Sequence, residues 1–167
     1  MKSNTVIKKA LQLLTVLTTV TFCSSVRENR TVPLHELAIE KHCQINSNLV
    51  SALIMVESAF DPGAKSGAGA RGLMQVRPIV LRDLRYSDSP SRLYESVFNI
   101  QVGCEYLEGL IVRYRGNVYK ALVAYNQGPT KANKYTILQA KKDKYVCKIF
   151  KEIKELESKD QAISRDM

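Results

Sequence analysis

The residue best suited to acid chemistry is Glu57, the only acid in the apolar and small-residue stretch over residues 49–60. This composition predicts a helix buried on most sides, and the Asp61-Pro62 pair that follows must end it near residue 60. Glu57 therefore falls in the last turn, where burial and the negative end of the helix dipole both disfavour a charged carboxylate. We expect a raised pKa, which suits a general acid that protonates the leaving oxygen of a glycosidic bond.

Two other interpretations of the acids stay open at this point. Asp61 is the nearest rival, but it precedes a proline and can hydrogen-bond turn amides with its own side chain, which favours a structural role. A Glu at a helix end is also commonly a plain surface residue. The elements around Glu57 must decide between these interpretations.

Helical periodicity dominates the chain, and no strand alternation is long enough to build a sheet, which predicts a mainly α fold. A loop over residues 61–72 contains four glycines and can bring its backbone close to a ligand. Besides the helix of Glu57, we expect one helix from Pro33 and others over about residues 78–86, 93–114, 118–125 and 145–156.

The composition predicts one exported globular domain. A length of 167 residues allows a single domain, and 45% hydrophobic residues supply a core, which excludes a disordered chain. Three lysines precede an apolar stretch over residues 10–23, so residues 1–25 are predicted to be a secretory signal. That stretch is too short to span a bilayer, so we expect a periplasmic or secreted protein without stable membrane insertion. Lipid attachment at Cys23 is the alternative.

The mature protein would then consist of a domain over residues 26–160 and a frayed tail over residues 161–167. The net charge of +9 favours anionic partners without choosing among them. Removal of the signal would leave Cys43, Cys104 and Cys147, of which two at most can pair with each other. We favour a Cys43–Cys147 bridge between the first and last helices, with three free thiols as the alternative.

Four sequence blocks give Glu57 a wider context. They read Glu57-Ser58-Ala59-Phe60-Asp61-Pro62 with Gly72-Leu73-Met74-Gln75, then Asn99-Ile100 with Gly103 and Tyr106-Leu107, then Ala124-Tyr125-Asn126-Gln127-Gly128-Pro129, and finally Tyr145-Val146. In residue type, spacing and order, these blocks resemble the soluble lytic transglycosylase family over about residues 46–150.

The resemblance implies a single lysozyme-like helical domain that cleaves the β-1,4 bond between MurNAc and GlcNAc in peptidoglycan glycan strands, without a metal or other cofactor. Glu57 would be the sole catalytic acid, and as a base it would later accept the proton of the MurNAc C6 hydroxyl, which leaves a 1,6-anhydro end. The substrate-binding residues that it implies are Ser66, Gln75, Tyr125, Asn126 and Tyr145, and the hydroxyl of Tyr145 would approach the catalytic acid. Ser66 could instead be an ordinary loop residue, and both tyrosines could be core aromatics.

Two departures from the family pattern concern the same cleft. Arg77 stands where the family usually has Met, and we expect it to contact a carboxylate of the peptide stem or of the MurNAc lactyl group. Lys142-Asp143-Lys144 stands where Glu-Thr-Arg is common, which leaves the orientation of the Tyr145 block open.

Other function classes find less support. His35, His42 and Cys43 lack the spacing of a metal site, and the lysine-rich residues 141–154 carry no nucleic-acid motif. Two rivals remain, a goose-type hydrolytic muramidase with a second catalytic acid and a catalytically silent wall-binding or assembly protein. By analogy alone, wall cleavage could serve a secretion or conjugation system.

Overall fold

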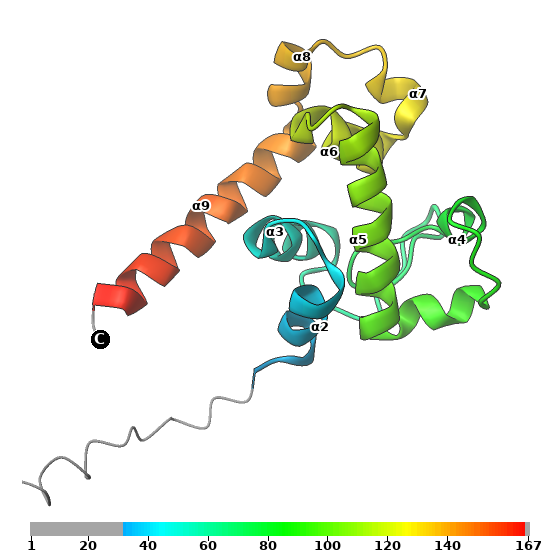
Figure 1. Ribbon diagram of the computed structural model, residues 1–167, viewed down its shortest axis with the longest axis horizontal. Helices are drawn as coiled ribbons and strands as arrows, with labels where there is room; N and C mark the ends of the chain where they lie inside the picture. The colour runs from blue at the N-terminus through cyan, green and yellow to red at the C-terminus, as the bar shows by residue number, and fades with distance from the viewer. Residues whose placement is uncertain (1–31, 166–167) are drawn as a thin grey trace, which may run out of the picture. The chain divides into compact units, whose positions relative to one another are not determined.

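The computed structural model describes residues 32–165, so the predicted signal over residues 1–25 and Cys23 lie outside the described residues. Within that range the chain forms helices, with β-bridges only at Lys65–Arg71 and Arg71–Val76, and the predicted mainly α class is confirmed. The elements in order are α2 (Leu34–His42), α3 (Ser47–Ser58), α4 (Pro78–Asp83), the 3₁₀ helix η1 (Pro90–Tyr94), α5 (Ser96–Arg113), α6 (Val118–Gln127), α7 (Pro129–Ala132), α8 (Ile137–Lys141) and α9 (Lys144–Arg165) (Figure 1).

Helix α3, which carries Glu57, has clear start and stop signals. The side chain of Asn46 accepts a hydrogen bond from the backbone N–H of Leu49 at 3.1 Å and caps the first turn. Ala59 and Phe60 adopt left-handed φ angles of 50° and 62°, which ends the helix at Ser58, two residues before the predicted end. Glu57 is consequently in the last turn, as predicted.

The helices enclose one core. Helix α3 packs against α9, α2 against α5, and α5 against α6 (Figure 1). The largest fully buried side chains are aliphatic and come from these helices and from the loop before α4, and they include Leu53, Ile54, Met74, Ile100, Leu107, Leu122 and Ile149. Removing this apolar surface from water is the main driving force that holds α3 in place.

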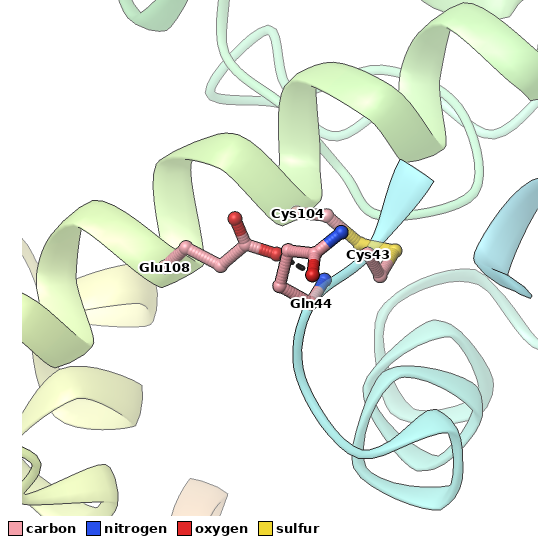
Figure 2. Close-up of a disulfide and its surroundings, with 4 residues drawn as sticks. All are labelled: Cys43, Gln44, Cys104 and Glu108. Carbon is pink, nitrogen blue, oxygen red and sulfur yellow. Dashed lines mark hydrogen bonds between the residues drawn. A yellow bond between two sulfur atoms is a disulfide. The ribbon is translucent and has the colours of Figure 1, made fainter. Parts of the chain in front are cut away.

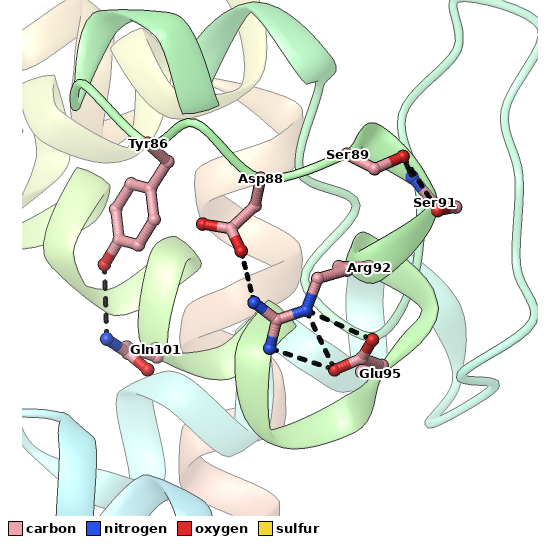
Figure 3. Close-up of polar contacts among 7 residues, drawn as sticks. All are labelled: Tyr86, Asp88, Ser89, Ser91, Arg92, Glu95 and Gln101. Carbon is pink, nitrogen blue, oxygen red and sulfur yellow. Dashed lines mark hydrogen bonds and ion pairs between the residues drawn. The ribbon is translucent and has the colours of Figure 1, made fainter.

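The segment before α5 differs from the prediction. Leu93 belongs to η1, and α5 begins at Ser96 rather than at residue 93. The guanidinium of Arg92 pairs with Asp88 and Glu95 (Figure 3). It also lies 4.2 Å from the centroid of the Phe98 ring. These local contacts hold the turn that leads into α5, although such exposed pairs contribute little to stability.

The predicted Cys43–Cys147 bridge is wrong, because the disulfide joins Cys43 to Cys104 with a Cα–Cα distance of 5.4 Å (Figure 2). Helix α2 packs against α5, which brings the end of α2 to the middle of α5. Cys147 is exposed and free because the inward face of α9 carries Val146 and Ile149 instead. The bridge spans 61 residues and contributes about 4 kcal/mol in the chain-entropy account.

Helix α9 is longer than the sequence predicted. It continues to Arg165, where a frayed tail was expected from residue 161, while residues 166–167 lie outside the described range. Its outer face carries Lys and Glu, and Lys151 pairs with Glu155 at 3.5 Å. Over residues 32–165, α9 and the other helices all fall short of the length and apolar character that a membrane span needs.

Candidate active site

Glu57 is half-buried in the last turn of α3 and meets α9 through one short contact. The hydroxyl of Tyr145, near the start of α9, donates a hydrogen bond to Oε1 of Glu57 at 2.5 Å. Burial raises the pKa of the Glu57 carboxyl above its ordinary value, and the Tyr145 hydrogen bond opposes this rise because it stabilises the ionised form. The predicted direction of the pKa shift is confirmed.

Two cavities meet at this carboxyl. The first, here called the loop-side cavity, has a volume of about 480 Å³ and lies between the loop before α4, α4 and α6. The second, the α9-side cavity, has a volume of about 680 Å³ and lies between α6, α7 and α9. Glu57 lines both, so a chain-like ligand that ran from one cavity to the other would pass the acid.

The structure brings the predicted site residues together around these cavities. The loop-side cavity is lined, along with Glu57, by five of them: Ser66, Gln75, Arg77, Tyr125 and Asn126. Asn126 also lines the α9-side cavity, where Tyr145 lies. Asp61 does not line either cavity, and its Oδ1 accepts a hydrogen bond from the backbone N–H of Gly63 at 2.8 Å, the turn contact expected of it.

A buried amide holds the wall of the loop-side cavity. Asn99, on α5, is fully buried, and its Nδ2 donates to the carbonyls of Arg71 and Leu93 at 2.8 and 2.7 Å. Its Oδ1 accepts from the backbone N–H of Met74 at 2.8 Å. Gly72 is needed beside it, because its φ is 71° and a Cβ there would lie 2.2 Å from the carbonyl oxygen of Leu93.

Ser66 and Gln75 are engaged within this loop and still present polar atoms to the cavity. The Ser66 hydroxyl accepts a hydrogen bond from the N–H of Ala70 at 3.1 Å, which leaves its proton for another acceptor. The Gln75 side-chain N–H₂ donates to the carbonyls of Ala64 and Gly72 at 3.2 and 3.0 Å. Its side-chain carbonyl oxygen has no hydrogen-bond partner among residues 32–165 and can accept from a ligand.

The rings of Tyr125 and Tyr145 are packed, but the hydroxyl groups of both donate hydrogen bonds. Tyr125 donates from its hydroxyl to the carbonyl of Met74 at 2.8 Å, which joins α6 to the loop. Burial, reinforced by the negative charge of Glu57, raises the pKa of Tyr125 and that of Tyr145 well above the ordinary value. Both hydroxyls therefore stay protonated and act as donors.

Sequence reasoning missed the residue that orients Tyr145. The Oδ1 of Asp143 accepts the backbone N–H of Tyr145 at 2.9 Å, and its Oδ2 accepts from Nε2 of Gln127 at 2.9 Å. Asp143 therefore caps the first turn of α9 and ties it to α6. The signal available in the sequence was an acid directly before a predicted helix. The hydrogen bonds of Asp143 fix the orientation of the Tyr145 block, which the Lys142-Asp143-Lys144 departure had left open.

Further carboxylates in the cleft are few. Besides Glu57, the loop-side cavity is lined by the exposed Asp83 and the α9-side cavity by Asp143. No cluster of three His, Cys, Asp or Glu side chains that could hold a metal ion occurs among residues 32–165. The arrangement places one desolvated acid between two polar cavities, where it can protonate a leaving group on a bound polymer.

Comparison with known proteins agrees with this geometry. Residues 36–147 match the family model described as "Transglycosylase SLT domain". The chain is 34% identical over 109 residues to the "Transglycosylase" of Enterobacteria phage PRD1, and 32% identical over 92 residues to the "Soluble lytic murein transglycosylase" of Escherichia coli K12. These matches cover 65% and 52% of this chain, but only 38% and 14% of the two relatives.

Solved structures give the same result for the fold. The lytic transglycosylase Slt of Pseudomonas aeruginosa superposes with a TM-score of 0.64 at 22% identity, covering 89% of this chain and 28% of that one. The 70-kDa soluble lytic transglycosylase of Escherichia coli gives a TM-score of 0.54 at 25% identity, covering 72% and 21%. The predicted lysozyme-like helical fold is confirmed.

Proposed function

Because the chain belongs to the transglycosylase SLT domain family, we propose that it cleaves the β-1,4 bond between MurNAc and GlcNAc in peptidoglycan as a lytic transglycosylase. The observation that carries the proposal is the position of Glu57, a carboxyl with a raised pKa where the two cavities meet. A glycan strand that occupies both cavities would place one glycosidic oxygen beside this acid.

The first half of the reaction uses the protonated acid. Glu57 donates its proton to the glycosidic oxygen as the bond to C1 of MurNAc breaks, and GlcNAc leaves with a new hydroxyl. Burial raises the pKa of Glu57, which is the direction that a general acid needs. The hydroxyl of Tyr145 on Oε1 then stabilises the carboxylate that the transfer creates.

The second half uses the same residue as a base. The carboxylate of Glu57 accepts the proton of the MurNAc C6 hydroxyl while the C6 oxygen bonds to C1, so the product carries a 1,6-anhydro ring and Glu57 is protonated again. No water is consumed. Ser66, Gln75 and Asn126 supply polar atoms to the cavity that fit sugar hydroxyl and acetamido groups.

The hydrolytic rival needs a second carboxylate to act on water or on the sugar. Asp143 is occupied by the N–H donors of Tyr145 and Gln127, which suits an orienting residue better than a base. Asp83 is exposed and lines the loop-side cavity, so it is the acid that a muramidase mechanism would have to use. The proposal therefore expects Asp83 to be dispensable.

The decisive experiment digests purified sacculi and identifies the products by mass spectrometry. We expect 1,6-anhydro ends from the wild-type chain and a rate at least about 1,000-fold lower for Glu57→Gln. Asp83→Asn is the matched control and should keep the anhydro product and most of the rate. Reducing ends in place of anhydro ends, with loss of activity in Asp83→Asn, would establish the muramidase instead.

The same digest tests the catalytically silent alternative. A wall-binding protein would leave the sacculi intact with the wild-type chain and with Glu57→Gln alike. Circular dichroism of both proteins would confirm that they are folded, so an inactive wild-type chain could not be attributed to unfolding.

For location and context, we propose that the chain acts on the wall from the periplasm, after export through its N-terminal segment. We further propose that it opens the wall locally for an envelope-spanning secretion or conjugation apparatus. Deletion of the gene should lower assembly of such an apparatus, and restoration by the wild-type chain but not by Glu57→Gln would tie the effect to cleavage. Normal assembly in the deletion strain would contradict this role.

A further inference from the structure

Charge is distributed unevenly along the chain. Residues 109–151 contain ten Lys and Arg residues and a single acid, Asp143. Residues 36–108 contain nine acids and seven Lys and Arg residues. The positive surplus of the fold therefore comes from the part that includes α6, α7, α8 and the start of α9, which is also the part that forms one side of the cleft.

Part of this surplus borders the α9-side cavity. Lys131 of α7 and Lys144 and Lys148 of α9 line it together with Glu57, and the two α9 lysines are one helical turn apart. All three side chains are exposed, and they form no ion pair with any residue over 32–165. Three exposed ammonium groups are thus available to a ligand that lies next to the acid.

Two acids, Glu57 and Asp143, line the α9-side cavity with the three lysines, so cations are in excess there. The oxygens of Asp143 accept hydrogen bonds from the backbone N–H of Tyr145 and from Nε2 of Gln127 rather than from a lysine, and burial raises the pKa of Glu57. The loop-side cavity differs, because its charged side chains besides Glu57 are one cation and one anion, Arg77 and Asp83. One end of the cleft is therefore cationic and the other end is balanced.

We propose that Lys131, Lys144 and Lys148 form a binding site for carboxylate groups that the glycan strand carries. This inference rests on the proposed function and adds a specificity to it. The sugar rings of a glycan strand are largely neutral, whereas the peptide attached to the lactyl group of MurNAc bears carboxylates, and the lactyl group bears one itself where no peptide is attached. The cationic cavity would select strands that present these groups within reach of the acid and would increase the rate at which they are captured.

Lysine suits this task better than arginine, whose guanidinium is planar and rigid. A long flexible stem lets each ammonium follow a carboxylate whose position varies with the conformation of the peptide, and it makes no demand for bidentate geometry. Exposed pairs of this kind contribute little one at a time, so the selectivity needs all three lysines and is weakened by salt.

The test compares a triple variant, Lys131→Gln with Lys144→Gln and Lys148→Gln, with a charge-matched control. The control carries Lys41→Gln, Lys154→Gln and Lys159→Gln, which remove the same charge at exposed positions that line neither cavity beside Glu57. Both sets are made in a Glu57→Gln background so that the probes are not cleaved, and binding is measured by titration calorimetry at low and physiological salt.

Three probes separate the sources of carboxylate. They are glycan strands with intact peptides, the same strands with all carboxyl groups converted to amides, and strands from which the peptides have been removed to leave free lactyl carboxylates. The parent protein is the Glu57→Gln chain with all of its lysines. We expect this parent protein and the control to bind the intact strands about tenfold more tightly than the amidated ones, and the triple variant to lose this difference. Tight binding of the peptide-free strands would show that the site also accepts a free lactyl carboxylate, and weak binding would restrict it to carboxylates of the peptide.

Each remaining outcome rejects one proposal only. Equal binding of intact and amidated strands by the parent protein, or an unchanged preference in the triple variant, would overturn the carboxylate site and leave the transglycosylase proposal intact. A loss of preference in the charge-matched control as well would reduce the effect to overall charge and also overturn the site. Failure of the parent protein to bind any strand would count against the proposed function itself.

Discussion

The two walls of the cleft beside Glu57 are held by different forces. The loop wall depends on backbone groups, because the three hydrogen bonds of buried Asn99 fix the carbonyls and the N–H of a loop that has little regular structure. The α9 wall depends on a helix whose Val146 and Ile149 are buried in the core. Its polar contacts, made by the side chains of Asp143 and Tyr145, are only part-buried.

This difference predicts that mutations in the loop wall change the stability of the fold and that mutations in the α9 wall change activity. A buried backbone group that loses its partner destabilises the whole fold, so the loop wall should respond to mutation first in stability. The α9 wall keeps its packing when a hydroxyl or a carboxylate is removed, so it should respond first in activity. Three substitutions test this separation, and they are ordered by expected free-energy change.

The largest effect is expected from Asn99→Ala. Two groups in buried hydrogen bonds with Asn99, the carbonyl of Leu93 and the N–H of Met74, would lose this partner, while the carbonyl of Arg71 would keep its bond from the N–H of Val76. We expect the free energy of unfolding to fall by about 3–5 kcal/mol, measured by urea denaturation. Gln101→Ala on the same helix is the control, since its bond to the Tyr86 hydroxyl at 3.2 Å is only partly buried (Figure 3). Equal losses in the two variants would show that the loop wall does not depend on Asn99.

The second effect is expected from Tyr145→Phe. Loss of the hydroxyl removes a hydrogen bond to the charged form of Glu57, so activity should fall about 10- to 100-fold with little change in stability. That bond lowers the pKa of Glu57, so its loss raises the pKa further. Because the acid must be protonated in the free enzyme, the decline of kcat/KM with rising pH should move to higher pH.

A parallel variant gives this prediction a control. Tyr125→Phe removes a hydroxyl that donates to the carbonyl of Met74 instead of to the acid. The pH at which kcat/KM declines should therefore stay where it is in the wild-type chain. A shift of the same size in both variants would mean that the pH profile does not report the contact between Tyr145 and Glu57.

The smallest effect is expected from Asp143→Ala. Loss of the cap on α9 should lower the free energy of unfolding by about 1 kcal/mol and lower kcat several-fold by loosening Tyr145. Thr136→Ala removes a comparable cap from α8, where the Thr136 hydroxyl accepts from the N–H of Gln139 at 3.2 Å. It should reduce stability to a similar degree and leave kcat unchanged. Equal kcat values in the two variants would remove Asp143 from the positioning of the site.

Some features of the site follow from neighbouring residues alone. The apolar stretch and the Asp61-Pro62 pair predicted both the helix of Glu57 and the place of the acid in its last turn. Helix ends are set by local backbone preferences, which explains why they could be predicted to within two or three residues in α3 and α5. The family resemblance then predicted that Ser66, Gln75 and Tyr125 belong to one site, and these residues do line one cavity.

Other features depend on segments that are distant in the chain. Asn99 bonds to the carbonyl of Arg71, 28 residues away, and nothing in the sequence around Asn99 specifies that partner. Cys43 paired with Cys104 and not with Cys147 because α2 packs against α5, a choice that periodicity within a helix does not encode.

The sequence by itself determined the helical class, the buried acid and its raised pKa, because each follows from apolar spacing and from residues within one or two turns. The family resemblance implied that the Tyr145 hydroxyl would approach Glu57, but only the tertiary structure shows this contact across 88 residues and places lysines from α7 and α9 in the cavity beside it. Contacts of this kind depend on how whole helices pack in three dimensions, and many packings are compatible with the same apolar faces.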